Sequence, residues 1–188
     1  MSYVQRRRFL WILFLAGLAL LVGVANATTL ARMQFEELVQ QATAVARVRC
    51  LGAESRWENG EIWTETRFEV VEQNKGSLPG FVSVKMLGGR VGNLHSRIED
   101  VPSFRAGEEA YVFLWTRNGE PYRVLGWTQG TFRIARDART GLETVTQDSA
   151  ASPMFDLRTR QFRHGGIRNL PIAIFQLKLR KALERNAP

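Results

Sequence analysis

The stretch AVARVRC at residues 44–50, followed after a turn by IWTETRFEV at residues 62–70, decides the fold. In both segments small or apolar residues alternate with charged or polar ones, which is the two-residue period of a β-strand with one buried face. The intervening residues 57–61, WENGE, contain an Asn-Gly pair that is typical of tight turns. The sequence therefore predicts a β-hairpin.

The length of the hairpin turn follows from the numbering of the two apolar faces. Both faces carry even residue numbers, so facing residues must sum to an even number if the faces are to meet. A two-residue turn at Asn59-Gly60 gives an odd sum, whereas a three-residue turn at residues 58–60 gives an even one with Gly60 in the left-handed position. We therefore predict the three-residue turn. The expected pairs are Cys50 with Phe68 and Arg49 with Glu69.

Outward from this hairpin the chain continues as short strands and turns. Further strand patterns cover residues 82–86, 110–115, 122–127 and 132–135, with a short ribbon near Val145. Residues 110–115 are apolar on both faces, which indicates a central strand or one covered by a helix. Helical patterns cover residues 35–42 and the chain from about Pro171, expected as the first helical residue. The predicted fold class is mostly β: a small antiparallel, OB-like barrel of about six strands with an N-terminal and a C-terminal helix, or alternatively a two-sheet sandwich.

The N-terminus has the pattern of a signal peptide. Arg6, Arg7 and Arg8 precede an uncharged apolar run over residues 9–24, which ends at the small-residue motif Ala25-Asn26-Ala27. This run is shorter than the roughly 20 residues that span a bilayer, so we expect cleavage after Ala27 and a mature chain beginning at Thr28, rather than a retained anchor. The arginine pair leaves the general secretory and twin-arginine routes both open.

The expected organisation is a signal peptide at residues 1–27, a β-barrel domain at 28–145, and a connecting arm with the C-terminal helix at 146–188, packed on the same domain. Cys50 is the only cysteine, so an intramolecular disulfide is excluded and a buried thiol is expected. The formal net charge is +8, and the loss of Arg6–Arg8 lowers it to +5, which is ordinary for a soluble domain of this size.

Several short motifs resemble a group of exported bacterial proteins of unknown function. The resemblance covers about residues 33–136. It rests on FEELV at 35–39, AVARV at 44–48, TRFEV at 66–70 ahead of Lys75-Gly76, Gly88-Gly89, FRAGE at 104–108 and QGTF at 129–132.

More remotely, a helix followed by a strand hairpin ending in Lys-Gly is similar to netrin-like domains, which include the tissue inhibitors of metalloproteinases and have an OB-type barrel. Those inhibitors use an N-terminal cysteine and several disulfides, whereas this chain would begin at Thr28 and has one cysteine. The resemblance therefore implies the barrel and not the inhibitory mechanism.

The sequence contains no recognisable catalytic or metal-binding motif. His95 and His164 are far apart and lack a close ligand partner, so no metal site is expected. No Gly-x-Ser-x-Gly motif occurs, and Cys50 is expected in the core. Glu99-Asp100 and Glu108-Glu109 are adjacent carboxylates, which are typical of acidic surface turns. We expect neither catalytic residues nor a cofactor.

Two segments are candidate binding surfaces. The first is the glycine-rich stretch from Gly88 to His95, which is expected to be a long irregular loop between strands, with polar side chains free to contact a partner. The second is the end of the first hairpin, where two tryptophans flank the turn; such aromatic residues cover a barrel end more often than they bind a ligand. The candidate residues are Gly88, Gly89, Arg90, Gly92, Asn93, His95, Trp57 and Trp63.

These observations predict an exported, non-catalytic binding module in the periplasm or extracellular space, with another exported protein as its partner. Nucleic acid is not expected as a partner in that compartment, and the membrane is expected to be contacted only by the signal segment before cleavage. The alternatives are a hydrolase or protease inhibitor with a site assembled from scattered residues, and a membrane-associated structural domain.

Overall fold

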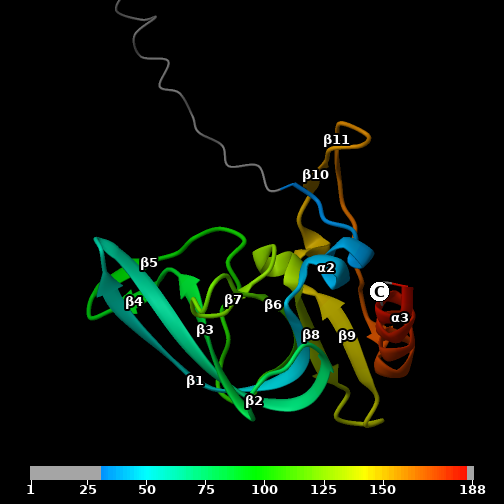
Figure 1. The fold of residues 1–188 in the computed structure, drawn as a ribbon, viewed down its shortest axis with the longest axis horizontal. Helices are drawn as coiled ribbons and strands as arrows, with labels where there is room; N and C mark the ends of the chain where they lie inside the picture. Colours follow the sequence, from blue (N-terminus) through cyan, green and yellow to red (C-terminus); the bar gives the residue numbers. More distant parts are fainter. Residues whose placement is uncertain (1–30, 186–188) are drawn as a thin grey trace, which may run out of the picture. The chain divides into compact units, whose positions relative to one another are not determined.

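A computed structural model describes residues 31–185 of the chain, and the predicted signal peptide lies outside these residues. The described part is mostly β, with one helix near each of its ends, as predicted (Figure 1). The helices are α2 (Phe35–Gln41) and α3 (Ile172–Arg185). The strands are β1 (Ala44–Glu58), β2 (Glu61–Lys75), β3 (Phe81–Leu87), β4 (Gly89–Val91), β5 (Leu94–Ser96), β6 (Glu109–Trp115), β7 (Arg123–Val124), β8 (Thr131–Arg136), β9 (Glu143–Gln147), β10 (Met154–Asp156), β11 (Gln161–Arg163) and β12 (Leu170–Pro171).

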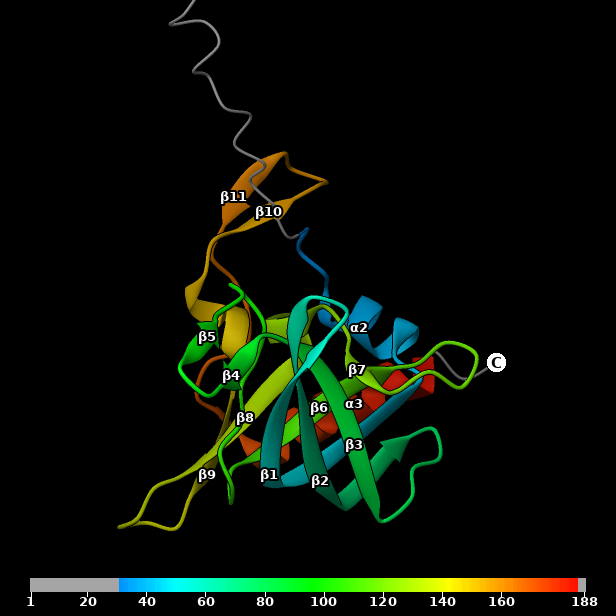
Figure 2. The same ribbon diagram turned by 90° about the vertical axis from the view of Figure 1, so that its left-hand side faces the viewer.

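Eight of these strands form one antiparallel sheet in the order β12-β9-β8-β6-β1-β2-β3, with β7 attached to β6. The remaining four strands form two small hairpins, β4–β5 and β10–β11. The sheet curls strongly, so that β1, β2 and β3 wrap around one side of the domain (Figure 2).

The predicted barrel of about six strands is not closed in the structure: the sheet stays open and has more than six strands. Its curl brings β3 toward β7, but the two meet only at an isolated bridge between Val84 and Tyr122, where Lys85 N donates to Tyr122 O at 2.8 Å. The reason lies in β6, which divides one edge between two partners. Leu114 and Trp115 pair with β7, whereas residues 110–112 pair with β8, so the sheet continues past β6 instead of closing.

The sheet has a hydrophobic core on each face, and β6 contributes to both, as its two-sided apolar pattern predicts. Inside the curl, the even-numbered residues of β1 and β6 pack with β2, β3 and Phe104. On the opposite face, Val45, Tyr111 and Phe113 pack against α2 and α3. Burial of both faces explains why residues 110–114 are almost entirely inaccessible to solvent.

The turn between β1 and β2 differs from the prediction, although the predicted strand pairs are confirmed. The turn is the two-residue Asn59-Gly60, with φ of 52° and 84°, and Glu58 pairs with Glu61. The register shifts by one residue between Cys50 and Gly52, at a β-bulge that contains Leu51. This shift changes the sum of paired residue numbers from odd near the turn to even at Cys50. Cys50 therefore faces Phe68, and Arg49 faces Glu69, as predicted.

Two further element predictions need correction at their boundaries. The strand expected over residues 122–127 is only two residues long, because Gly126 and Trp127 have φ of 60° and 55° and lead into a 3-10 turn. Pro171 is not the first helical residue; it pairs with Thr144 at the end of β12, and α3 begins at Ile172.

Candidate binding surface

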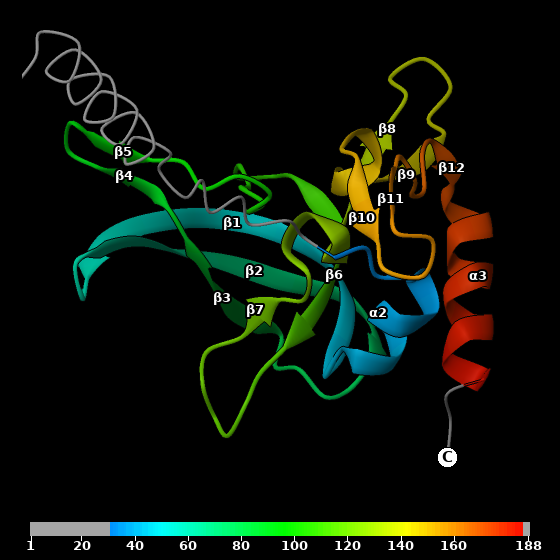
Figure 3. The same ribbon diagram turned by 90° about the horizontal axis from the view of Figure 1, so that it is seen from above.

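The β1–β2 hairpin extends beyond the part of β1 that pairs with β6, and its outer part, residues 52–67, is here called the distal hairpin. Strand β1 pairs with β6 only from Ala44 to Arg49, whereas its pairing with β2 continues to Glu58. The distal hairpin and α3 lie at opposite ends of the described domain (Figure 3). This projection places the first predicted turn, with its tryptophans, away from the two cores.

The glycine-rich stretch folds back onto the distal hairpin. The irregular loop expected from Gly88 to His95 is instead the β4–β5 hairpin, with Gly92-Asn93 as its turn and Arg90 directly opposite His95. Gly92 has a φ of 58°, and it is the first of two turn residues, which is the position where glycine is favoured in tight hairpins. The predicted irregular loop is therefore wrong for this segment, because most of it forms the two strands β4 and β5.

Short hydrogen bonds attach β4 to the distal hairpin. Thr64 Oγ1 donates to Gly88 O at 2.5 Å and lies 2.8 Å from Ser55 Oγ. Ser55 Oγ in turn accepts from Arg90 N at 3.2 Å. A Cβ atom on Gly89 would overlap with both hydroxyl oxygens, and Gly89 has a φ of 135°, so only glycine allows this close approach.

We expect Gly89→Ala to lower the free energy of unfolding by at least about 1 kcal/mol, because it forces a side chain into a strained backbone region and against two hydroxyls. Hydrogen exchange at β4 amides should rise with it, since the hairpin must lift off. Gly92→Ala is the matched control, because it also places a side chain at a positive φ, of 58°, but nothing lies within 4 Å of its Cβ, so it shares the backbone strain without the close contact. Equal melting temperatures for the two variants would contradict the close contact.

The structure brings most of the predicted site residues to the distal hairpin and the β4–β5 hairpin attached to it. Trp57 lies two residues beyond Ser55 on the same strand, so its side chain is on the face that carries β4. Trp57 is 51% exposed, and Arg90, Asn93 and His95 are all exposed. Leu94, which the sequence analysis did not single out, is 56% exposed in the same hairpin. The distal surface is defined here as Trp57, Arg90, Asn93, Leu94 and His95.

Trp63 does not belong to the distal surface. It points to the other face of β2, where Lys85 Nζ lies 4.8 Å and Arg123 Cζ 5.4 Å from the centre of its ring. Arg123 Cζ also lies 6.0 Å from the centre of the Trp115 ring, so Arg123 lies between two tryptophans, Trp63 and Trp115, and contacts both. Trp63 is half-buried in this arrangement, and its role there is to pack the outer face of the curl.

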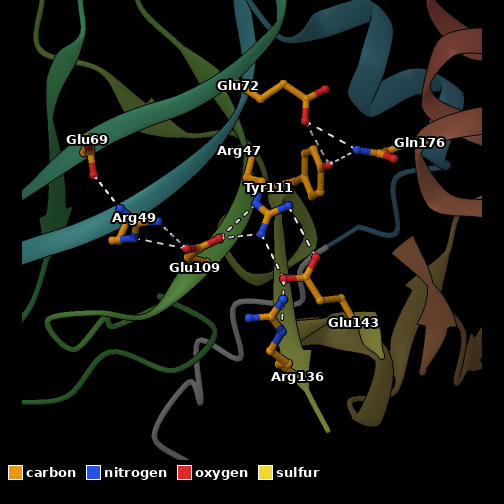
Figure 4. Close-up of polar contacts among 9 residues, drawn as sticks. All are labelled: Arg47, Arg49, Glu69, Glu72, Glu109, Tyr111, Arg136, Glu143 and Gln176. Carbon is orange, nitrogen blue, oxygen red and sulfur yellow. Dashed lines mark hydrogen bonds and ion pairs between the residues drawn. The ribbon is translucent and has the colours of Figure 1, made fainter. Parts of the chain in front are cut away.

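A network of ion pairs, which the sequence analysis mostly missed, crosses the helix-bearing face of the sheet (Figure 4). Glu109 accepts hydrogen bonds from Arg47 at 2.6 and 2.9 Å and from Arg49 at 2.9 and 3.0 Å. Arg47 also contacts Glu143, and Arg49 contacts Glu69. Only the last pair was predictable from strand alternation, because the other partners lie on strands distant in sequence.

Beside this network, Tyr111 is buried under α3 with its hydroxyl between two polar groups. Gln176 Nε2 donates to the hydroxyl at 3.0 Å, and the hydroxyl lies 3.4 Å from Glu72 Oε2. Burial raises the pKa of Tyr111 to about 12, so the phenol stays protonated at any physiological pH. The Tyr111 hydroxyl therefore stays neutral and links α3 to the sheet through Gln176.

The carboxylates of this region are held by arginines rather than left free for chemistry. Burial would raise the pKa of Glu109, but the hydrogen bonds and charges of Arg47 and Arg49 outweigh it and lower the pKa. Asp148 has its pKa raised by burial, although Arg133 Nε donates to both of its oxygens at 2.9 and 3.1 Å. Between residues 31 and 185 no three side chains of the metal-binding types gather in one place.

Comparisons of this chain with protein families, with curated proteins and with solved structures find no match. Among the helices of the described residues, neither is long and apolar enough to cross a bilayer.

Proposed function

We propose that this protein is an exported, non-catalytic binding module that contacts another exported protein through the distal surface. The observation that carries the proposal is an exposed tryptophan on the distal hairpin together with an exposed arginine and an exposed leucine on the β4–β5 hairpin attached to it. Tryptophan and arginine are the residue types that most often dominate the energy of protein–protein interfaces.

The distal surface is rigid at its base, which supports a role in recognition. The Ser55–Thr64–Gly88 hydrogen bonds fix β4 on the hairpin, so little conformational entropy is lost when a partner binds. The charges around it are mixed, with Arg56, Arg90 and Arg97 beside Glu54 and Glu58. A surface with charges of both signs is more complementary to another protein than to a polyanion, because a polyanion binds best to a uniformly basic groove.

The other candidate functions have less support. Two of the more buried carboxylates with shifted pKa values, Glu109 and Asp148, are bonded to arginines, which stabilise their charge. The similarity to netrin-like domains remains a prediction, and it would supply a fold rather than an activity.

The proposal is tested by capture from an exported protein fraction, with the full chain as bait and two matched triple variants. In the first, Arg90, Asn93 and His95 become alanine; in the second, Gln161, Arg163 and His164 become alanine. All six side chains are exposed, and each set contains an amide, an arginine and a histidine.

We expect the first variant and Trp57→Ala to lose a protein that the native chain and the second variant retain. The melting temperatures should differ little, because exposed substitutions usually change stability by about 0.5 kcal/mol or less. Retention of the same protein by the folded first variant, or no specific capture by the native chain, would contradict the proposal.

A further inference from the structure

The β10–β11 hairpin projects from the described domain at the end opposite to the turn between β8 and β9 (Figure 1, Figure 2). Met154 and Asp156 of β10 are buried at its base, whereas all three residues of β11 are exposed. The loop between the two strands and β11 together, residues 157–163, are here called the basic tip. Its projection leaves the basic tip accessible to a partner.

The only carboxylate of the hairpin is turned away from this surface. Asp156 Oδ1 accepts hydrogen bonds from the backbone N–H groups of Arg158 at 2.9 Å and Thr159 at 3.0 Å, and Arg32 Nη1 lies 3.9 Å from Oδ2. Asp156 is only 6% exposed. Its side chain therefore shapes the start of the loop and adds little negative charge to the surface of the tip.

The basic tip carries three exposed arginines, Arg158, Arg160 and Arg163. None of the three belongs to an ion pair formed among residues 31–185, in contrast to Arg47 and Arg49, which share Glu109. The sequence from residue 157 to residue 183 contains seven arginines and lysines and no aspartate or glutamate. The tip therefore presents charge of one sign, unlike the distal surface, and is complementary to a polyanionic surface.

Two large apolar side chains lie among these arginines. Leu157 is 68% exposed and Phe162 is 62% exposed. The Phe162 ring packs edge-on against Phe155, with 5.3 Å between the ring centres, which supports it from one side only. A soluble polyanion would pair with the arginines and leave both apolar groups in water. A lipid bilayer accommodates both kinds of side chain, because its phosphates bind arginines and the layer beneath them buries apolar groups.

The N-terminal segment of the described chain reaches the base of this hairpin. Arg32 N donates to Phe155 O at 2.9 Å, and Ala31 forms a parallel bridge with Phe155. In the sequence, the apolar run of the predicted signal peptide ends at Val24, seven residues before Ala31. Seven extended residues span at most about 25 Å. A chain held in a membrane by that run before cleavage therefore keeps the hairpin base within this distance of it.

We propose that the basic tip binds the surface of an anionic lipid bilayer, with its three arginines on lipid phosphates and with Leu157 and Phe162 inserted among the headgroups. This adds a second membrane contact to the one expected from the signal segment, and it persists after cleavage. The basic tip shares no residue with the distal surface, so the inference does not depend on the proposed function.

A fluorophore that responds to its surroundings identifies the surface that meets the lipid, even where the apolar run of the full chain inserts by itself. Cys50 is buried and is the only cysteine, so Leu157→Cys can be labelled selectively. Leu142→Cys is the matched control, because Leu142 is 66% exposed in the turn between β8 and β9.

With vesicles of phosphatidylcholine and phosphatidylglycerol, the emission of the label at position 157 should shift to the blue, and that of the label at position 142 should not. Vesicles of phosphatidylcholine alone should shift neither label. Equal shifts at the two positions, an equal shift at position 157 with neutral vesicles, or no shift with anionic vesicles would overturn the proposal.

Two triple variants of the labelled chain test the arginines. Each arginine near an anionic surface strengthens binding by about fivefold, so glutamine at positions 158, 160 and 163 should raise the anionic lipid needed for half of the shift at least about tenfold. The matched control removes the same charge from three other exposed arginines: Arg105, Arg117 and Arg139. Equal effects of the two triple variants would overturn the proposal, because the charge would then act without regard to its position.

Phe162→Ser separates a bilayer from a soluble polyanion. It should weaken the response to anionic vesicles, whereas Phe81→Ser, at a phenylalanine that is 54% exposed on β3, should not. If heparin shifts the label at position 157 as vesicles do, and Phe162→Ser changes neither response, then the tip binds polyanions in general and the proposed bilayer contact is wrong.

Discussion

Replacing Phe175 with alanine should lower the free energy of unfolding by about 3–5 kcal/mol, because the change removes a fully buried aromatic ring and leaves a cavity. The Phe175 ring joins α3 to the sheet and to α2. Its centre lies 4.8 Å from that of Tyr111, 5.3 Å from Phe132 and 5.8 Å from Phe35. Each of these aromatic contacts contributes beyond the buried area alone.

Leu177→Ala is the matched control for this experiment, because it lies on the same helix with 45% of its surface exposed. It should cost well under about 1 kcal/mol in a urea unfolding titration. Similar losses for the two variants would mean that α3 does not pack on the sheet through the Phe175 face.

Glu109→Gln should be the most damaging polar substitution, with a loss of about 2 kcal/mol at neutral pH. The carboxylate accepts four hydrogen bonds from Arg47 and Arg49. A glutamine keeps one oxygen and turns an N–H₂ group toward the guanidinium donors of Arg47, whose side chain is only 18% exposed. The two arginines would then lose the carboxylate that they share, and each would keep one acidic partner, Glu143 for Arg47 and Glu69 for Arg49.

The loss should depend on pH in a defined direction. The folded-state pKa of Glu109 is lowered below its ordinary value of 4.5, so its charge stabilises the fold fully above that value. This contribution declines as the pH falls through the lowered pKa, where the native carboxylate is protonated. The difference between native and variant stability should therefore be constant near neutrality and approach zero in strong acid.

The pKa of Asp148 is raised, so its contribution to stability falls as the pH rises, which is opposite in sign to that of Glu109. Asp148 is present in both the native protein and the Glu109→Gln variant, so its contribution cancels in the difference between their stabilities. Glu69→Gln serves as the control, because Glu69 contacts Arg49 alone and its side chain is 39% exposed. A pH-independent loss for Glu109→Gln would contradict the proposed role of the charge.

The part of the fold that was predicted best from the sequence is the β1–β2 hairpin, where apolar and polar residues alternate over many positions. The pairing of Cys50 with Phe68 follows from two long apolar faces that must be buried together. The turn could not be predicted in the same way, because a bulge at Leu51 restores parity far from the turn, and an exposed leucine gives no signal of it.

The barrel was predicted from strand number, but closure depends on which strands share the edge of β6. That choice is made by residues distant in sequence, since β7 and β8 pair with different halves of the same strand. The candidate site shows the same limit. The glycine content of residues 88–95 indicated a loop. The structure has a hairpin there instead, which packs at Gly89 against the hydroxyls of Ser55 and Thr64.

The bulge at Leu51 has a consequence for how the distal hairpin could diversify. Cys50 and Gly52 pair with the adjacent residues Phe68 and Arg67, so deleting Leu51 would make the ladder regular from Val48 to Glu58 and leave the remaining side chains on their original faces. Such a deletion would remove the local bend and extra twist that a bulge imposes. The loss of a single codon can therefore change the direction of the hairpin without changing the side chains that it exposes. The orientation of the hairpin and the residues on its surface can thus evolve separately.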